Sequence, residues 1–237
     1  MTQSGAVSAH GQLPLAVSLR DEATLDNFLV LPGLAPPVSA LQPLSAGKAE
    51  PFIFLHGPAG VGKSHLLQAC CQEPGIRAQY LPLSQLRELT PADVLTGLEI
   101  LDLVCLDDVH AVAGIEAWEL ALFNFYNDVH KTGCRLLAAA LEPPRALNVR
   151  LADLRSRLTS AVVYRLGEPS DEEKTDILCF RAQRRGMSLA PDVARYIVNR
   201  APRALHDLLL LLDELDQASL ARQRLLSIPF VREMLGW

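Results

Sequence analysis

The sequence predicts a doubly wound α/β domain with a parallel sheet, followed by a small all-α domain. Up to about residue 167, apolar runs of strand length alternate with segments of helical spacing, a pattern typical of a parallel sheet covered by helices. Beyond that point only helical spacing remains. We therefore expect an N-terminal segment of residues 1–22, an α/β domain of residues 23–167 and a helical domain of residues 168–237.

Four apolar runs have the length and composition of buried parallel strands, namely residues 51–57, 103–108, 134–141 and 161–166. Residues 63–72 and 117–133 have helical spacing, and Gly133 is suited to end the second of these helices. Residues 30–51 are rich in Pro, Ala and Gly, which indicates a connector with at most a helical turn. Residues 1–10 are small and polar, which predicts disorder.

The helical domain is predicted to begin just after Gly167. Ser170 and Glu173 have the spacing of a capping box, in which each side chain bonds the other residue's backbone N–H at the start of a helix. The spacing that follows predicts helices over 171–185, 191–200 and 203–218, and then a short tail.

Composition excludes several classes of protein. The chain has 237 residues, with 22 Lys and Arg against 27 Asp and Glu, and this acidic balance argues against a protein that coats nucleic acid. The longest apolar run, residues 208–215, is too short to span a membrane and contains acids. No secretory signal is evident at the N-terminus. The five cysteines lack metal-ligand spacing, so we expect reduced thiols in a cytoplasmic protein.

Residues 57–64, GPAGVGKS, fit the phosphate-binding motif G-x-x-x-x-G-K-[ST] between a predicted strand and a predicted helix. Glycines let successive backbone N–H groups face phosphate oxygens, and the helix N-terminus adds a favourable dipole. Lys63 is expected to reach the β- and γ-phosphates, and Ser64 to ligate Mg²⁺. The nucleotide-binding set is then Gly57, Pro58, Ala59, Gly60, Val61, Gly62, Lys63, Ser64 and His65. The alternative is a glycine-rich turn that binds nothing.

An acidic pair, Asp107 and Asp108, ends the second predicted strand. Ligands of open α/β sheets bind at the carboxyl ends of the strands, where these carboxylates would lie. Asp107 is expected to hold Mg²⁺ through water, and Asp108 to lie where a water could be polarised. Alone, such a pair is as often a solvated strand end.

Six further segments carry a resemblance to a known family. They are TLDNF (24–28), DDVHAVAG (107–114), PPRAL (143–147), LADLRSRLTSAVVYRL (151–166), APRALHDLLLLLDEL (201–215) and RLLSIPFVREML (224–235). Together with the phosphate-binding motif they resemble the AAA+ class of P-loop NTPases, and within it the family of the bacterial replication initiator DnaA and its relative Hda. The resemblance covers most of the chain and implies an AAA+ domain followed by a helical lid.

The resemblance implies roles that the residue patterns alone do not. Asn27 and Phe28 match the segment that lines the adenine pocket, Arg157 matches an arginine finger, and Arg203 matches the sensor arginine of the lid. By pattern alone both arginines would be assigned to the solvated surface. The implied ligands are ADP or ATP with Mg²⁺.

Two departures from the family pattern qualify the expected function. The chain ends after its lid, where DnaA continues into a DNA-reading domain, so we expect no direct sequence-specific DNA binding. Ala140 and Leu141 stand where a polar sensor residue is usual, and neither side chain can orient a water beside a γ-phosphate. We therefore expect little or no intrinsic ATP hydrolysis, and ADP as an alternative ligand.

The N-terminal segment contains QLPLAV, residues 12–17. An extended peptide with a leading glutamine and spaced apolar residues can dock in a preformed groove. The stretch resembles the motif by which replication proteins attach to the polymerase sliding clamp (its beta subunit), through Gln12, Leu13, Leu15 and Val17. The alternative is a strand that folds back on the α/β domain.

The resulting hypothesis is an Hda-like inhibitor of DNA replication initiation that is cytoplasmic and reaches the nucleoid through the clamp. It would present Arg157, with Asp108 as a second catalytic candidate, and promote hydrolysis of ATP bound to DnaA. The resemblance also allows a homodimer. Two alternatives stay open: a helicase loader or adaptor that acts by binding, and a small-molecule kinase, for which no acceptor pocket is evident.

Overall fold

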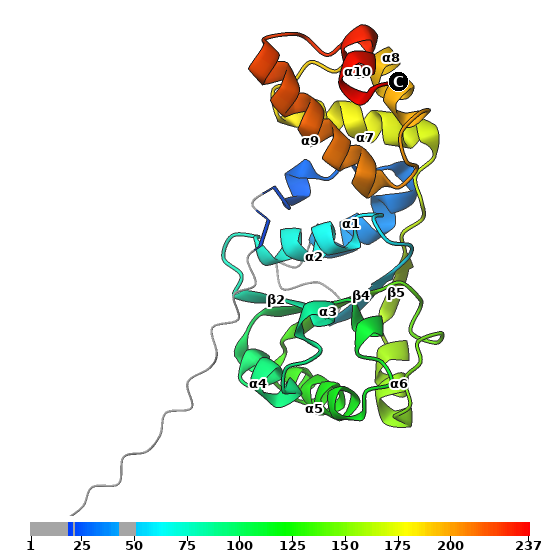
Figure 1. The fold of residues 1–237 in the computed structure, drawn as a ribbon. Helices are drawn as coiled ribbons and strands as arrows, with labels where there is room; N and C mark the ends of the chain where they lie inside the picture. The colour runs from blue at the N-terminus through cyan, green and yellow to red at the C-terminus, as the bar shows by residue number, and fades with distance from the viewer. Residues whose placement is uncertain (1–18, 21, 43–50) are drawn as a thin grey trace, which may run out of the picture.

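The computed structural model describes residues 19–20, 22–42 and 51–237, which form an α/β domain and a helical lid beside it (Figure 1). Five parallel strands form one sheet in the order β2-β3-β4-β1-β5. They are β1 (Phe52–His56), β2 (Ala78–Pro82), β3 (Leu103–Asp107), β4 (Arg135–Ala140) and β5 (Val162–Arg165). The predicted parallel sheet is therefore confirmed. The four predicted strands are present, and β2 is a fifth.

Helices cover both faces of the sheet (Figure 1). One face carries α1 (Ala35–Leu41) and α2 (Lys63–Cys71). The other carries α3 (Leu83–Leu86), α4 (Pro91–Leu95), α5 (Glu116–Thr132) and α6 (Ala152–Thr159). Gly133 ends α5 with φ +80°, as expected of a glycine that accepts the left-handed conformation.

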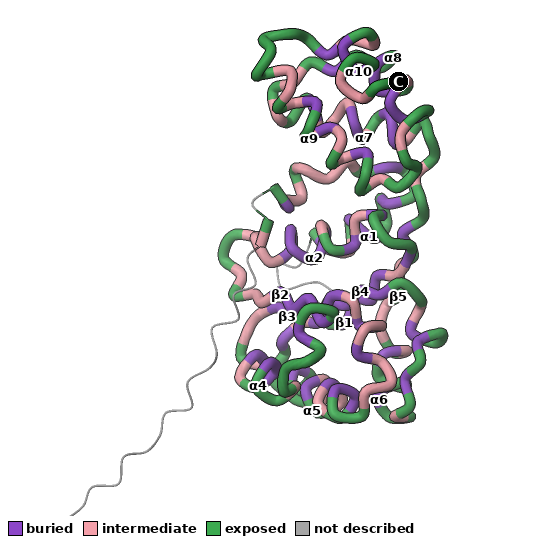
Figure 2. Tube along the Cα trace, in the orientation of Figure 1, coloured by how far each residue is buried: buried purple, intermediate pink, exposed green. Residues whose placement is uncertain are grey.

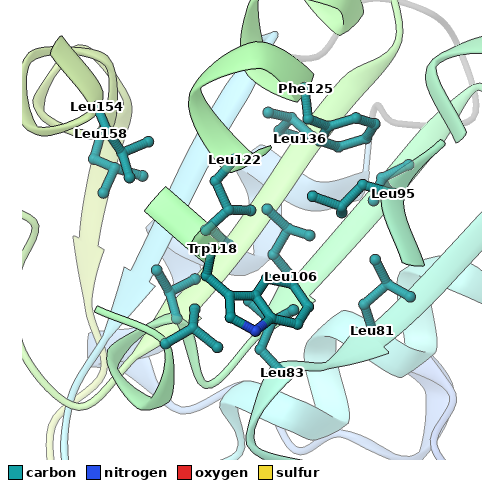
Figure 3. Packing of buried hydrophobic residues seen from close by; sticks show 14 of the residues in the cluster. Leu81, Leu83, Leu95, Leu106, Trp118, Leu122, Phe125, Leu136, Leu154 and Leu158 are labelled. Carbon is teal, nitrogen blue, oxygen red and sulfur yellow. The ribbon is translucent and has the colours of Figure 1, made fainter. Parts of the chain in front are cut away.

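The sheet separates two apolar clusters, so its central strands are buried on both faces (Figure 2). Trp118 of α5 lies in the first cluster with Leu106 and Leu122 (Figure 3), and its indole N–H donates to the Arg87 carbonyl at 2.9 Å. Leu55 of β1 and Leu67 of α2 lie in the second cluster. Burial on both faces explains why the predicted strands are continuous apolar runs.

The lid consists of α7 (Asp171–Arg184), α8 (Pro191–Val198), α9 (Leu205–Arg222) and α10 (Ile228–Leu235) around its own apolar core. The predicted capping box starts α7: the Ser170 N–H donates to Glu173 at 2.7 Å, and the Glu173 N–H donates to the Ser170 hydroxyl at 3.2 Å. The predicted tail is instead mostly helix α10, because Ser227 caps its start and Phe230 is buried in the lid core.

The predicted connector is more regular than its composition suggested. It contains the 3-10 turn η2 (Pro32–Leu34) followed directly by α1, and a second 3-10 turn, η1 (Leu25–Asn27), precedes it. Prolines stand in the first turns of η2 and α1, where the missing N–H costs no hydrogen bond. In the structure, the N-terminal segment means the described residues 19–20 and 22–42. It lies between α2 and the lid (Figure 1). Within the described residues, no helix has the length and apolar character needed to cross a membrane.

Candidate nucleotide site

A cavity of about 1000 Å³ opens between the phosphate-binding loop and the lid. Its walls come from the N-terminal segment, from residues 59–65 and from helices α7 and α9. The sequence-predicted residues that line it are Asn27, Phe28, Ala59, Gly60, Val61, Gly62, Lys63, Ser64 and His65. Segments far apart in the sequence therefore meet around one space large enough for a nucleotide.

Glycines of the loop occupy positions that a side chain could not. Gly57 has φ +152°, and a Cβ there would lie 2.1 Å from the Leu166 carbonyl oxygen. Gly62 has φ +99°, and a Cβ there would lie 2.8 Å from the Phe28 ring. The loop thus curls tightly against β5 on one side and against the predicted adenine-pocket segment on the other.

Lys63 is buried at the start of α2, with its ammonium held by the loop itself. The Nζ donates to the carbonyls of Gly57 at 2.7 Å and Pro58 at 2.6 Å. Burial lowers the pKa of Lys63, although the carboxylates of Asp107 and Asp108 act in the opposite direction. An ammonium has three donors, so one N–H remains for a phosphate oxygen.

Asp107 lies at the end of β3, beside the phosphate-binding loop, and is 1% exposed. The Tyr80 hydroxyl donates to Asp107 at 2.7 Å. Burial raises the pKa of Asp107, although the side chains of Ser64 and Tyr80 act in the opposite direction. A hydroxyl and a carboxylate together are hard oxygen ligands of the kind Mg²⁺ prefers.

Asp108 is bound by a side chain of α3. Its backbone is left-handed, with φ +55°, and its carboxylate accepts a hydrogen bond from the Ser84 hydroxyl at 2.6 Å. Neither Asp107 nor Asp108 lines the cavity. The bond to Ser84 was not anticipated from the sequence, because the short helix α3 that carries Ser84 has no clear sequence signal.

Aromatic and polar groups of the N-terminal segment meet α2 at one end of the cavity. The rings of Phe28 and His65 lie 5.5 Å apart, and His65 Nε2 is 2.9 Å from the Thr24 carbonyl oxygen. Burial lowers the pKa of His65, so its ring favours the neutral form. The two rings are inclined by 41°, and both line the cavity, where they offer apolar surface to a base.

Arginines of α7 bind the N-terminal segment across the cavity. Arg181 and Arg185 both pair with Glu22, at 2.7 and 3.1 Å, and Arg185 also pairs with Asp213 of α9. The Arg184 Nε donates to the Asn27 side chain at 2.9 Å. Although the arginines are visible in the sequence, nothing there indicates that Glu22 and Asn27, more than 150 residues earlier, are their partners.

The two family-matched arginines lie in different places. Arg203 is exposed just before residues 204–207, which line the cavity, but it does not line the cavity itself. Arg157 is exposed on α6, in the helical layer on the far side of the sheet from the lid (Figure 1). Arg157 is therefore remote from the cavity of its own chain.

The strand end beside the site is apolar. Strand β4 lies between β1, which leads into the loop, and β3, which ends at Asp107. Ala140 closes β4 and is fully buried, while Leu141 is 42% exposed. Neither side chain can hydrogen-bond a water there. Gln12, Leu13, Leu15 and Val17 lie outside the described residues.

Two protein families match this chain. Residues 19–165 match the family described as bacterial DnaA ATPase domain, which is more than half of the chain. Residues 171–235 match the family described as Hda, lid domain. Residues 166–170, between β5 and α7, separate the two matches.

Solved structures share the fold. The match to domain III of the Thermotoga maritima replication initiation protein DnaA has 22% identity and a TM-score of 0.76, covering 93% of this chain and 98% of that one. AMPPCP-bound DnaA from Aquifex aeolicus matches with 22% identity and a TM-score of 0.71, over 84% of this chain and 66% of that one. The Thermotoga maritima RuvB Holliday junction branch migration motor matches with 20% identity and a TM-score of 0.66, over 90% and 71%.

Proposed function

Since the chain belongs to the family of bacterial DnaA ATPase domains and carries a lid of the Hda type, we propose that it is an Hda-like negative regulator of replication initiation. It binds an adenine nucleotide in its cavity and docks on the sliding clamp through residues 12–17. It then presents Arg157 to ATP bound on DnaA, whose hydrolysis silences the initiator.

Nucleotide binding is supported by how well the cavity residues fit the ligand. Lys63 keeps one N–H donor beside the glycine-rich loop, and Phe28 and His65 line the cavity where adenine would bind. The matching Aquifex aeolicus DnaA binds AMPPCP. Ser64 and Asp107 would hold Mg²⁺, with phosphate oxygens and water as the remaining ligands, because Mg²⁺ rarely takes an all-protein cage. The metal would neutralise charge on the phosphates.

The position of Arg157 is the observation that carries the proposal. It is exposed and lies across the sheet from its own cavity, so only a nucleotide on a neighbouring molecule can come into its reach. A guanidinium placed at a transferring phosphoryl group stabilises the charge that develops there, and removing such a group costs about 10³–10⁵ in rate. The chain would therefore complete the active site of DnaA.

The apolar end of β4 supports a weak ATPase of the chain itself. Ala140 cannot orient the attacking water, and Asp108 is engaged by Ser84. Such a chain would retain its nucleotide as a structural ligand. Its own ATP hydrolysis would be about 100-fold slower than that of a chain with a polar residue at this strand end, the usual cost of one missing polar group at a transition state.

The test is single-turnover hydrolysis of ATP preloaded on DnaA, with clamp-loaded DNA and increasing amounts of the chain. The unmodified chain should accelerate hydrolysis, and Arg157→Ala should remove the acceleration. Gln12→Ala should raise the concentration of chain needed without changing the maximal rate. A parallel arm with ATP preloaded on the chain alone measures its own hydrolysis.

Arg195→Ala is the matched control, because Arg195 is an exposed helical arginine of the lid. It should stimulate as well as the unmodified chain. Full stimulation by Arg157→Ala would refute the arginine finger. A chain that binds the replicative helicase and leaves DnaA-bound ATP unchanged would instead be a helicase adaptor. Rapid hydrolysis by the chain alone would contradict the proposed role of Ala140.

A further inference from the structure

Arg157 rests on an aromatic ring of the neighbouring helix. Its guanidinium carbon lies 5.5 Å from the ring centroid of Tyr126, on α5. With the described residues the guanidinium makes no hydrogen bond or ion pair. The ring therefore attracts the cation through its face and leaves every N–H donor of Arg157 available.

Tyr126 is also tied to the end of α6. Its hydroxyl is 3.2 Å from the Ser160 hydroxyl, which in turn donates to the Arg157 carbonyl at 2.7 Å. The Tyr126 ring itself is held between Phe52, at 5.6 Å, and His130, at 6.3 Å and nearly parallel. Tyr126 therefore contacts the Arg157 side chain through its ring, and reaches the Arg157 backbone through its hydroxyl and Ser160.

The other end of α6 is held by α5 as well. Glu119 is 2% exposed, and its carboxylate accepts hydrogen bonds from the N–H groups of Arg150 at 2.9 Å and Leu151 at 2.7 Å, just before α6 begins. It also accepts from Gly114 at 2.7 Å. Helix α5 therefore fixes α6 at both ends.

We propose that Tyr126 is a positioning residue for Arg157. Its aromatic face holds the guanidinium, so that the guanidinium is already oriented when it meets the phosphoryl group of a nucleotide bound to a partner. This inference rests on the proposed arginine finger. An exposed arginine loses rotamer freedom when it engages a phosphate. The ring restricts that freedom beforehand without occupying the donors that the phosphate requires.

The first test uses the DnaA–ATP assay with Tyr126→Leu and Tyr126→Phe. Tyr126→Leu should lower the maximal rate about fivefold, the size of an exposed cation–π contact, with an unchanged half-saturating concentration. Tyr126→Phe keeps the ring and should recover most of that loss. The matched control is Tyr196→Leu, which removes a similar pair in the lid, with Arg200 at 4.8 Å, and should leave the rate unchanged.

A second measurement needs no DnaA. Phenylglyoxal, which modifies exposed guanidinium groups, is applied to the chain, and mass spectrometry compares Arg157 with Arg195 as an internal standard. Modification of Arg157 relative to Arg195 should rise about threefold in Tyr126→Leu and little in Tyr126→Phe. Thermal unfolding of each variant accompanies the measurement. A partly unfolded variant would show faster modification of both arginines.

The outcomes separate this inference from the proposed function. If Arg157→Ala stimulates fully, the arginine finger fails and this inference fails with it. If Arg157→Ala is inactive but Tyr126→Leu keeps the full maximal rate, only the positioning role is overturned. A raised half-saturating concentration with an unchanged maximal rate would likewise overturn it, because Tyr126 would then contribute to docking and not to the orientation of Arg157.

Discussion

At Gly57 the phosphate-binding loop has no room for any side chain. A Cβ added there would lie 2.1 Å from the Leu166 carbonyl oxygen, so Gly57→Ala must force the backbone at residue 57 away from the backbone at Leu166. We expect it to lower the free energy of unfolding by about 3 kcal/mol, the upper range for overpacking. Urea denaturation measures the loss.

Gly75→Ala is the control for Gly57→Ala. Gly75 also has a positive φ, +80°, but a Cβ there meets nothing within 4 Å. It should cost only about 1 kcal/mol, the strain of a left-handed alanine. Equal losses in the two variants would mean that the contact with Leu166 contributes nothing.

At the residue scale, sequence predicts what is local. The phosphate-binding loop could be recognised because its glycines, Lys63 and Ser64 are consecutive and their spacing is dictated by the phosphate. The contact between Arg157 and Tyr126 could not be recognised from the sequence. Tyr126 lies 31 positions earlier and becomes a neighbour of Arg157 only when α5 packs beside α6. No local pattern distinguishes Tyr126 from any other aromatic residue on an amphipathic helix.

At the scale of the element, α5 carries a buried charge, Glu119, that contributes to stability. Burial raises the pKa of Glu119, but the N–H groups of Arg150, Leu151 and Gly114 outweigh it and hold the pKa below its ordinary value. The ionised form therefore stabilises the fold above about pH 4.5. This stabilisation is lost as pH falls through the lowered pKa of the folded state.

Glu119→Gln should lower the free energy of unfolding at pH 7 by about 2 kcal/mol, because it weakens charged hydrogen bonds to buried backbone. The difference from the unmodified chain should shrink as pH falls from about 5 to about 3. Glu116→Gln, an exposed change on the same helix, should stay within about 0.5 kcal/mol. Denaturation series at several pH values would contradict this if the difference persisted at acidic pH.

Strand β2 was not predicted because its position at the edge of the sheet leaves it without a strong sequence signal. It is an edge strand whose first residues are half-exposed, and it ends at Pro82, so it has no continuous apolar run. Its register is set by pairing with β3, where Tyr80 opposes Cys105. The central strands each contain a continuous apolar run, which predicts them directly.

The whole molecule is joined across its cavity by ion pairs. Glu22 of the N-terminal segment is bound by Arg181 and Arg185 of the lid. Glu22→Gln should loosen the lid and increase the dissociation rate of bound adenine nucleotide about threefold, the size of a partly exposed pair. A fluorescent nucleotide analogue measures the rate. The effect should shrink at high salt because the pair is screened.

Glu233 provides the control for the Glu22 prediction. It too is bound by two arginines, Arg222 and Arg224, but all three residues lie within the lid. Glu233→Gln should therefore leave nucleotide dissociation unchanged. Equal acceleration in both variants would show that general loosening of the lid, and not its attachment to the N-terminal segment, controls release.

The order of the strands has a consequence for synthesis of the chain. Strand β1 is made first among the five, yet Phe52 pairs with Leu136 of β4 and Ile53 pairs with Val162 of β5. The ribosome adds about 5–20 residues per second, so several seconds pass between the synthesis of β1 and the synthesis of either neighbour. During that interval a strand of Phe, Ile and Leu is exposed in the nascent chain, which makes it a site for chaperone binding or misassembly.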